Sequence, residues 1–403
     1  MKSKCDWLIK HTQCLYCVAL AVFVISLLLE STLLSYDSEV NGNGFFNQVL
    51  QLMRYSAYGI SLLLICTNII NKQYSHTKLT VYLISFLITA ASSFVTQDKT
   101  YMLYTLLFIA AEKIPTRKIF LIYFTCQLVV LLSMSIGTQL GLITDIVLDI
   151  RSRSLLGFRW SSYAPYYLMF IEMSYIALKC GKLKWYEGLS FVSFATWLFY
   201  KTNSRFAFIL TIFISVFFML YHVWPQLNHL LSKHKRIIVL LPFVIAIGAI
   251  LLHYCYDSSC PFMKALNSLL SHRLRLGSSA ISEYGFSLLG NPNIQWIGNG
   301  LGTAEGAYNY VDCSYLQILL SSGILVLSLI LVIYSIILWL TLAKEKYYLT
   351  WLVLCVMLFA IFEPRLANMT YNPFMLLCVT EADGKWDKQN MFFISGNRNG
   401  GPS

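Results

Sequence analysis

One carboxylate stands where a long apolar run begins, late in the sequence. Asp312 follows Tyr310 and Val311, and the apolar run 315–342 starts almost directly after it. A carboxylate in this position can cap a helix by accepting hydrogen bonds from its first backbone N–H groups. It can also act as a general base that takes a proton from an attacking sugar hydroxyl group. The sequence leaves both interpretations open.

Arginines form a second group of residues that could take part in binding or catalysis. Eight of the eleven lie in polar breaks that hold few lysines, or at the ends of apolar runs beside those breaks: Arg54, Arg151, Arg153, Arg159, Arg205, Arg273, Arg275 and Arg365. A guanidinium group is a planar fork that binds two phosphate oxygens at once and keeps its charge at any pH. We therefore expect some of them to bind a lipid-linked phosphate or diphosphate. Solvated loop residues and interfacial anchors are the alternative for about half of them.

The composition requires these residues to be positioned by membrane helices. The 403 residues are 57% hydrophobic and 12% charged, whereas soluble domains carry roughly 25% charged residues. The apolar residues arrive in runs long enough to cross about 30 Å of hydrocarbon as helices. We therefore predict an all-α integral membrane protein with about twelve transmembrane helices. The expected spans are 14–34, 47–70, 79–96, 100–112, 119–141, 164–179, 185–200, 206–224, 237–255, 315–342, 348–363 and 370–380.

Lysines give the expected orientation of these spans. Of nineteen lysines, sixteen lie before the first span, in alternate breaks, or in the C-terminal tail. The positive-inside rule places these segments in the cytoplasm. Both termini are then cytoplasmic, the first span is a retained helix, and residues 256–314 form one large extracytoplasmic loop. The domain prediction is a polytopic membrane domain over 1–380 and a polar, disordered cytoplasmic tail over 381–403. Topology also explains the net charge of +11 better than a nucleic-acid partner does.

The large loop contains an amphipathic pattern and a glycine cluster. Leucines recur at helical spacing between Pro261 and Leu276, which predicts a helix lying along the membrane interface. On a helical wheel of this segment Arg273 falls among the leucines, His272 lies at their margin, and Arg275 points away from them. Glu283 and Tyr284 follow, and then Gly298-Asn299-Gly300-Leu301-Gly302. This cluster lacks the Lys-Ser/Thr ending of a nucleotide loop, so we expect a tight re-entrant turn. Cys255 and Cys260 flank the loop, and a disulfide between them is a minor alternative to free thiols.

Several of these motifs occur in a characteristic order. The turn Thr202-Asn203-Ser204-Arg205 precedes the Arg273/Arg275 loop, the glycine cluster and Asp312-Cys313-Ser314-Tyr315-Leu316. Phe362-Glu363-Pro364 and Tyr371-Asn372-Pro373-Phe374 follow. This order resembles the Wzy-type polysaccharide repeat-unit polymerases of capsule and exopolysaccharide loci, in the O-antigen ligase/polymerase superfamily. The resemblance is specific in the second half of the chain and only topological in the first. One departure is Cys313, where the polymerases usually have asparagine.

The resemblance implies a GT-C-like membrane glycosyltransferase of the bacterial cytoplasmic membrane. It would move a growing glycan from undecaprenyl diphosphate to the next lipid-linked repeat unit, without cofactor, metal or nucleotide sugar. Its donor and acceptor would be lipid-linked glycans in contact with membrane lipid, and its protein partners a chain-length regulator and a flippase. Asp312, Arg273 and Arg275 would be catalytic. Substrate-binding positions would be Arg205, Arg159, His272, Glu283, Tyr315 and Arg365.

Two alternative functions remain at this stage. A ligase of the same superfamily would transfer finished polymer to a different acceptor, although the family's ligases have histidine where this chain has Asp312. A flippase or exporter of lipid-linked sugar would move the same substrate without bond chemistry. Such carriers tend to show internal repeats and charges along a central cavity. No repeat is visible here and the polar residues concentrate in one loop, so the sequence favours an enzyme.

Overall fold

The computed structural model is predominantly helical. It describes residues 2–40, 42, 44–148, 152–292, 294–301 and 306–381, and of residues 2–10 it describes only the backbone. The helices of the first half are α1 (Lys2–Glu30), α2 (Leu33–Val40), α3 (Phe45–Ile70), α4 (His76–Thr96), α5 (Thr100–Ala110), α6 (Thr116–Gln139), α7 (Tyr163–Leu178) and α8 (Trp185–Thr202). Those of the second half are α9 (Arg205–Leu220), α10 (Gln226–Lys233), α11 (Lys235–Tyr254), α12 (Pro261–Leu269), α13 (Arg273–Tyr284), α14 (Ser314–Ala343) and α15 (Tyr347–Phe359).

Within the part of the chain that the structure describes, six helices are long and apolar enough to cross a membrane. They lie over His11–Glu30, Phe45–Ile70, His76–Thr96, Thr116–Gln139, Lys235–Tyr254 and Ser314–Ala343. Shorter apolar helices cover Thr100–Ala110, Arg205–Leu220 and Tyr347–Phe359. The prediction of a helical membrane protein is therefore confirmed in outline, while the number of twelve spans stays a prediction. A short antiparallel hairpin, β1 (Val147–Leu148) with β2 (Arg153–Ser154), joins α6 to α7 and was not predicted.

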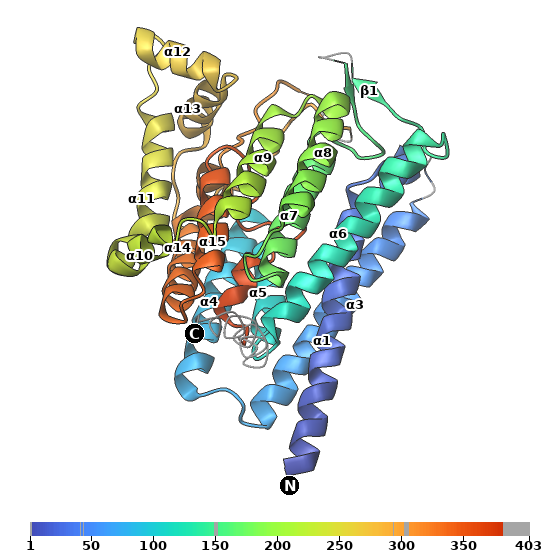
Figure 1. Ribbon diagram of the computed structural model, residues 1–403, viewed down its shortest axis with the longest axis vertical. Helices are drawn as coiled ribbons and strands as arrows, with labels where there is room; N and C mark the ends of the chain where they lie inside the picture. The colour runs from blue at the N-terminus through green and yellow to red at the C-terminus, as the bar shows by residue number, and fades with distance from the viewer. Residues whose placement is uncertain are drawn as a thin grey trace, which may run out of the picture.

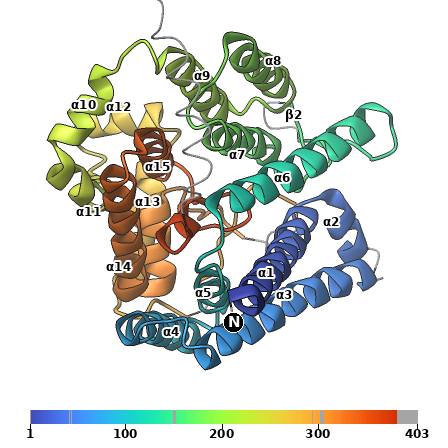
Figure 2. The same cartoon turned by 60° about the horizontal axis from the view of Figure 1, so that its bottom comes forward.

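The helices form one bundle. In Figures 1 and 2, α1, α3 and α6 lie at one side, and α10 to α12 lie at the other, in the same region as α14 and α15. α11 packs along α14, and α13 returns against both helices. The interior is rich in aromatic side chains, such as Phe23 against Tyr58 and Tyr104.

Lysine-bearing connections share an end of the bundle. The side chain of Lys113 donates to the carbonyl of Gln73, and Gln13 donates to the carbonyl of Lys113. These contacts bring the α3–α4 and α5–α6 connections beside the N-terminal part of α1, at the lower end in Figure 1. α12 and β1 lie at the opposite, upper end. These two lysine-bearing connections therefore lie together at one end, while the membrane orientation of that end stays a prediction.

Between α15 and Glu381, the last residue that the structure describes, the chain forms no transmembrane helix. Residues 370–380, predicted as the twelfth span, form irregular backbone and one 3-10 turn at Phe374–Cys378. Side chains from α6 satisfy its carbonyl groups. The Gln127 amide donates to the carbonyls of Thr370 and Tyr371 at 3.1 and 3.0 Å. Irregular backbone is tolerated at membrane depth only where protein supplies such partners.

Helix α14 is broken near its first third. Gly323 has φ 89° and ψ 173°, a conformation that other residues rarely adopt. The freed N–H groups of Ile324 and Leu325 donate to the carbonyls of Ser287 and Leu288 at 3.0 and 3.1 Å. A Cβ atom at position 323 would lie 2.3 Å from the nitrogen of Gly290. Glycine is therefore required for the loop after α13 to approach α14 this closely.

The predicted amphipathic helix over Pro261–Leu276 is two helices. α12 ends at Leu269, and α13 begins at Arg273. Ser271 and His272 between them adopt positive φ angles of 55° and 66°. The turn redirects the chain, so that Arg273 faces the bundle instead of lying on the face of one continuous interfacial helix. The predicted tail falls almost entirely on residues 382–403, outside the described residues. Glu381 bonds through its backbone to Ile114 and Thr116.

Candidate functional site

Two carboxylates and one guanidinium group meet near the start of α13, the start of α14 and the end of α15. Arg273 Nε lies 2.9 Å from Asp312 Oδ2, and its Nη2 lies 2.9 Å from Glu363 Oε1. Its Nη1 donates to the carbonyl of Phe362 at 2.7 Å. The exposed fractions of the three side chains are 25% for Arg273, 14% for Asp312 and 7% for Glu363. This constellation is thus largely buried, and every nitrogen of the guanidinium group has an oxygen partner.

Ser314 fixes the spacing of the two carboxylates. Its hydroxyl donates to the carbonyl of Glu363 and accepts from the backbone N–H of Leu366 at 3.1 Å. Its own N–H donates to the carbonyl of Ala360 at 2.8 Å. The start of α14 is therefore joined to the chain that follows α15. Asp312, two residues before Ser314, is thereby held near Glu363, which belongs to the chain that follows α15.

Asp312 is not the N-cap of α14. The N-cap is Cys313, and no side chain caps the helix there. The helix-cap interpretation of Asp312 is therefore wrong: its carboxylate is turned to Arg273. Burial raises the pKa of the Asp312 carboxyl to about 7, a rise that Arg273 opposes and Glu363 reinforces. A carboxyl group with a pKa near neutrality is suited to accept and return a proton at physiological pH.

Arg365 lies deeper, in a cage of tyrosine rings. Its guanidinium carbon lies 4.5 Å from the ring centre of Tyr371, 5.4 Å from that of Tyr163 and 5.6 Å from that of Tyr166. Aromatic ring faces attract a cation, most strongly when water is excluded. Arg365 is 7% exposed, and its Nε has no hydrogen-bond partner. A second positive charge thus stands behind the Asp312–Arg273–Glu363 group.

Four predicted site residues are exposed and do not contact that group. Arg205 begins α9, and Arg275 lies two residues beyond Arg273 on a different face of α13. His272 lies at the turn before α13, where its Nδ1 is 3.4 Å from the Asn267 amide nitrogen. Glu283 lies near the end of α13. The structure therefore does not join Arg205, Arg273 and Arg275 into one cluster.

Two further predicted residues have partners within the protein. Arg159 Nη2 donates to Glu39 at 2.7 Å and to the Ser35 hydroxyl at 3.0 Å, which ties its loop to α2. Tyr315 is fully buried, and its hydroxyl donates to the carbonyl of Met357 at 2.8 Å. Tyr315 therefore joins α14 to α15 in the interior.

The glycine cluster packs against an indole ring. A Cβ atom at Gly298 or Gly300 would lie 2.0 or 2.1 Å from atoms of the Trp160 ring. Trp160 in turn contacts Tyr310, with ring centres 5.4 Å apart. The glycines therefore let the loop lie flat on Trp160, and their role is close packing. Gly302 lies outside the described residues.

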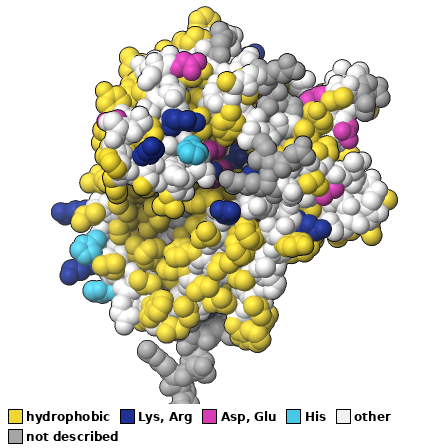
Figure 3. Space-filling model, turned by 90° about the horizontal axis from the view of Figure 1, so that it is seen from above, with side chains coloured by type: hydrophobic (Ala, Val, Ile, Leu, Met, Phe, Trp, Pro, Cys, Tyr) yellow, Lys and Arg dark blue, Asp and Glu magenta, His cyan; other side chains and the backbone are white. Residues whose placement is uncertain are grey.

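Figure 3 shows the upper end of the molecule as a surface. Lysine, arginine and histidine side chains gather beside a recess in which acidic and basic side chains are visible. A broad hydrophobic hollow adjoins this recess. Charged side chains and apolar surface are thus adjacent at this end.

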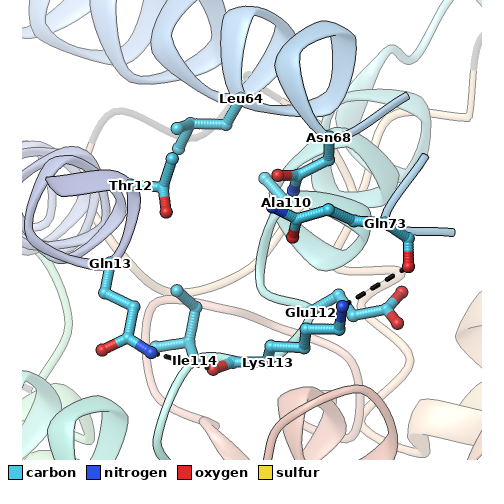
Figure 4. Close-up of a pocket in the computed structure, with 9 residues that line it drawn as sticks. All are labelled: Thr12, Gln13, Leu64, Asn68, Gln73, Ala110, Glu112, Lys113 and Ile114. Carbon is cyan, nitrogen blue, oxygen red and sulfur yellow. Dashed lines mark hydrogen bonds between the residues drawn. The ribbon is translucent and has the colours of Figure 1, made fainter. Parts of the chain in front are cut away.

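A small pocket at the other end offers no comparable site. It lies among Thr12, Leu64, Asn68, Glu112 and neighbouring residues, and hydrogen bonds of Gln13 and Lys113 close its rim (Figure 4). Its volume is about 30 Å³, roughly the share of one water molecule. It is too small for a sugar or a lipid headgroup.

Sequence reasoning missed the second carboxylate of the constellation. Glu363 appeared only within the motif Phe362-Glu363-Pro364, and the signal for its role was a charged residue directly after an apolar run. No group of three or more metal-ligating side chains occurs among the described residues. The cysteines with described side chains are free, including Cys255 and Cys260. Comparisons with protein-family models, curated proteins and solved structures find no match for this chain.

Proposed function

We propose that this chain is a membrane glycosyltransferase that polymerises undecaprenyl-diphosphate-linked oligosaccharide repeat units at the outer face of the bacterial cytoplasmic membrane. The observation that carries the proposal is the largely buried Asp312–Arg273–Glu363 group. A sugar on a diphosphate is already activated. Its transfer needs a proton acceptor for the incoming hydroxyl and positive charge for the departing diphosphate.

In the proposed reaction Asp312 accepts the proton of the acceptor hydroxyl. The acceptor oxygen forms a bond to the anomeric carbon of the donor glycan while the bond from that carbon to the diphosphate oxygen breaks. The electron pair leaves with undecaprenyl diphosphate. Once Asp312 is protonated, Arg273 keeps only Glu363 as an anionic partner. Its charge then becomes available to the leaving group at the moment when negative charge develops there.

The remaining arginines would serve the substrate in different ways. Arg365 adds a fixed positive potential behind the carboxylates. Arg205 and Arg275 are exposed near the same end and would bind diphosphate oxygens in bidentate fashion. The exposed His272 and Glu283 are candidate contacts for sugar hydroxyl groups. A chain-length regulator and a flippase are the protein partners that this function would require.

The lipid-linked glycan profile of a strain that lacks the protein tests this function. A polymerase predicts accumulation of a single repeat unit on the lipid at the outer face. Full-length polymer on the lipid would instead indicate the ligase. Accumulation at the cytoplasmic face would indicate the flippase and would overturn the enzymatic proposal. Complementation with the wild-type gene is the control, because it must restore the polymer.

A further inference from the structure

A groove on the side of the bundle is lined by none of the residues of the Asp312–Arg273–Glu363 group. It has a volume of about 190 Å³ and lies between α4, α5 and α14. Its floor is the irregular chain after Arg365, through Ala367, Met369 and Met375. For scale, an engineered apolar cavity of about 150 Å³ binds benzene. The groove is therefore large enough for part of a hydrocarbon chain.

Four polar side chains of the groove have hydrogen-bond partners within the protein. Ser85, Thr89 and Thr105 donate to carbonyls of their own helices, and the last two hydroxyls lie 3.3 Å apart. Tyr82 donates to Glu112 at 2.6 Å. These side chains therefore do not indicate a sugar, a nucleotide or a peptide as the ligand. The rest of the wall is aliphatic or aromatic, with flexible methionines that adapt to an irregular partner.

The groove is continuous with the surface that faces the bilayer. Val81, Val332 and Ile336 belong to its wall and are 53%, 44% and 39% exposed. α4 and α14 are both candidate membrane spans. Lipid hydrocarbon surrounds such helices. Because the bilayer core holds no water, hydrocarbon is also what can fill a groove at that depth.

Its length and one nearby charge indicate the kind of chain. The wall on α14 runs from Val326 to Ile336, which is about 15 Å at 1.5 Å per residue. This is about half of the roughly 30 Å hydrocarbon core, the thickness of one leaflet. Lys78 precedes Tyr82 by one turn of α4, and its side chain is 56% exposed while paired to Glu112. An acyl chain of this length in the groove would bring a phosphate near Lys78.

We propose that the groove binds one acyl chain of a membrane phospholipid from the leaflet on the lysine-rich side. The chain lies along α14 and supports the irregular segment that carries Arg365. The length of one leaflet favours an acyl chain over a long isoprenoid chain. This inference does not depend on the enzymatic proposal, because it concerns a different face and a different ligand.

Lipid retention tests the proposal. The protein is purified in mild detergent, and its bound lipids are counted and identified by mass spectrometry. We expect about one phospholipid per chain in the wild type and in Leu83→Phe, which also places a phenylalanine on α4, at an exposed position outside the groove. Ser85→Phe, which fills the groove, should lose it. Equal retention in Ser85→Phe, no retained lipid, or a retained isoprenoid would each overturn the proposal.

A second measurement uses the unmodified protein, in case Ser85→Phe does not fold. The wild type is reconstituted into phosphatidylethanolamine vesicles that contain a phospholipid with a photoreactive diazirine on its acyl chain. After illumination, cross-links should occur on the peptide that holds the buried floor residues Ala367 and Met369, as well as on α14. Cross-links confined to outward-facing residues would show that no chain enters the groove, and the proposal would fail.

Discussion

Nε of Arg273 lies 2.9 Å from Oδ2 of Asp312, and the same guanidinium group binds Glu363 from the segment that follows α15. Two carboxylates therefore share one cation in a largely buried position. Such an arrangement favours loss of one negative charge, and burial raises the pKa of the Asp312 carboxyl.

Asp312→Asn should abolish polymer formation. Asparagine keeps the size of the side chain but cannot accept the proton, and a general base contributes about 10²- to 10⁴-fold to the rate. The measurement is polymer formed from lipid-linked repeat units by purified protein in vesicles. Asp257→Asn is the matched control, because Asp257 is an exposed loop residue bonded to Ser259. Near-normal activity of Asp312→Asn would remove the base from the proposed mechanism.

Activity should depend on pH through the protonation of Asp312. Only the ionised form accepts a proton, so the rate should rise about tenfold per pH unit below 7 and level off above it. Stability should change in the opposite direction. The folded protein holds this proton more tightly than the unfolded chain, so the free energy of unfolding should fall as pH rises toward 7. Thermal unfolding of Asp312→Asn should lack this pH-dependent contribution to stability. If the stability of the variant depended on pH as that of the wild type does, other groups would be responsible for the dependence.

Arg273→Lys should reduce activity by about 10²-fold, the typical cost of losing a positioned charge-stabilising donor. A lysine ammonium group cannot bind Asp312, Glu363 and the Phe362 carbonyl in the planar geometry that arginine uses. Arg54→Lys is the control, since Arg54 is also ion-paired, with Glu30, but lies on α3. Equal activity of the two variants would mean that charge alone, without geometry, is sufficient at Arg273.

Arg205→Lys and Arg275→Lys should affect binding more than chemistry. Both side chains are exposed and would bind the diphosphate of the donor lipid equally in the ground state and the transition state. We expect KM for the donor to rise severalfold with little change in kcat. Steady-state rates over a range of donor concentrations in vesicles measure this. An unchanged KM in both variants would show that these arginines are ordinary surface charges.

Tyr315→Phe should preserve activity and lower stability. The variant loses the hydrogen bond to the Met357 carbonyl, which contributes about 1 kcal/mol to the free energy of unfolding. Thermal unfolding in detergent should show a small decrease, while polymer formation continues. Loss of activity with unchanged thermal stability would place the Tyr315 hydroxyl at the substrate after all.

The sequence was informative about local features and less so about contacts between distant segments. Asp312 and Arg273 were identified from their positions at the end and middle of the large loop, and they do meet. Glu363 was not placed with them, because its approach depends on Ser314 bridging two chain segments. Apolar composition likewise predicted a span over 370–380. Nothing local indicates that Gln127, far away in α6, would supply the hydrogen bonds that let this segment remain irregular.

This irregular segment has a consequence for biogenesis. A helix satisfies its own backbone and can enter the bilayer alone, but residues 366–378 depend on donors from α6 and α14. Tyr334 of α14 donates to the carbonyl of Leu366 at 2.7 Å, as Gln127 does to Thr370 and Tyr371. Insertion of this part must therefore follow assembly of those helices. The segment that carries Arg365 is thus completed late, and the chain acquires its second buried cation only after the helices around it have assembled.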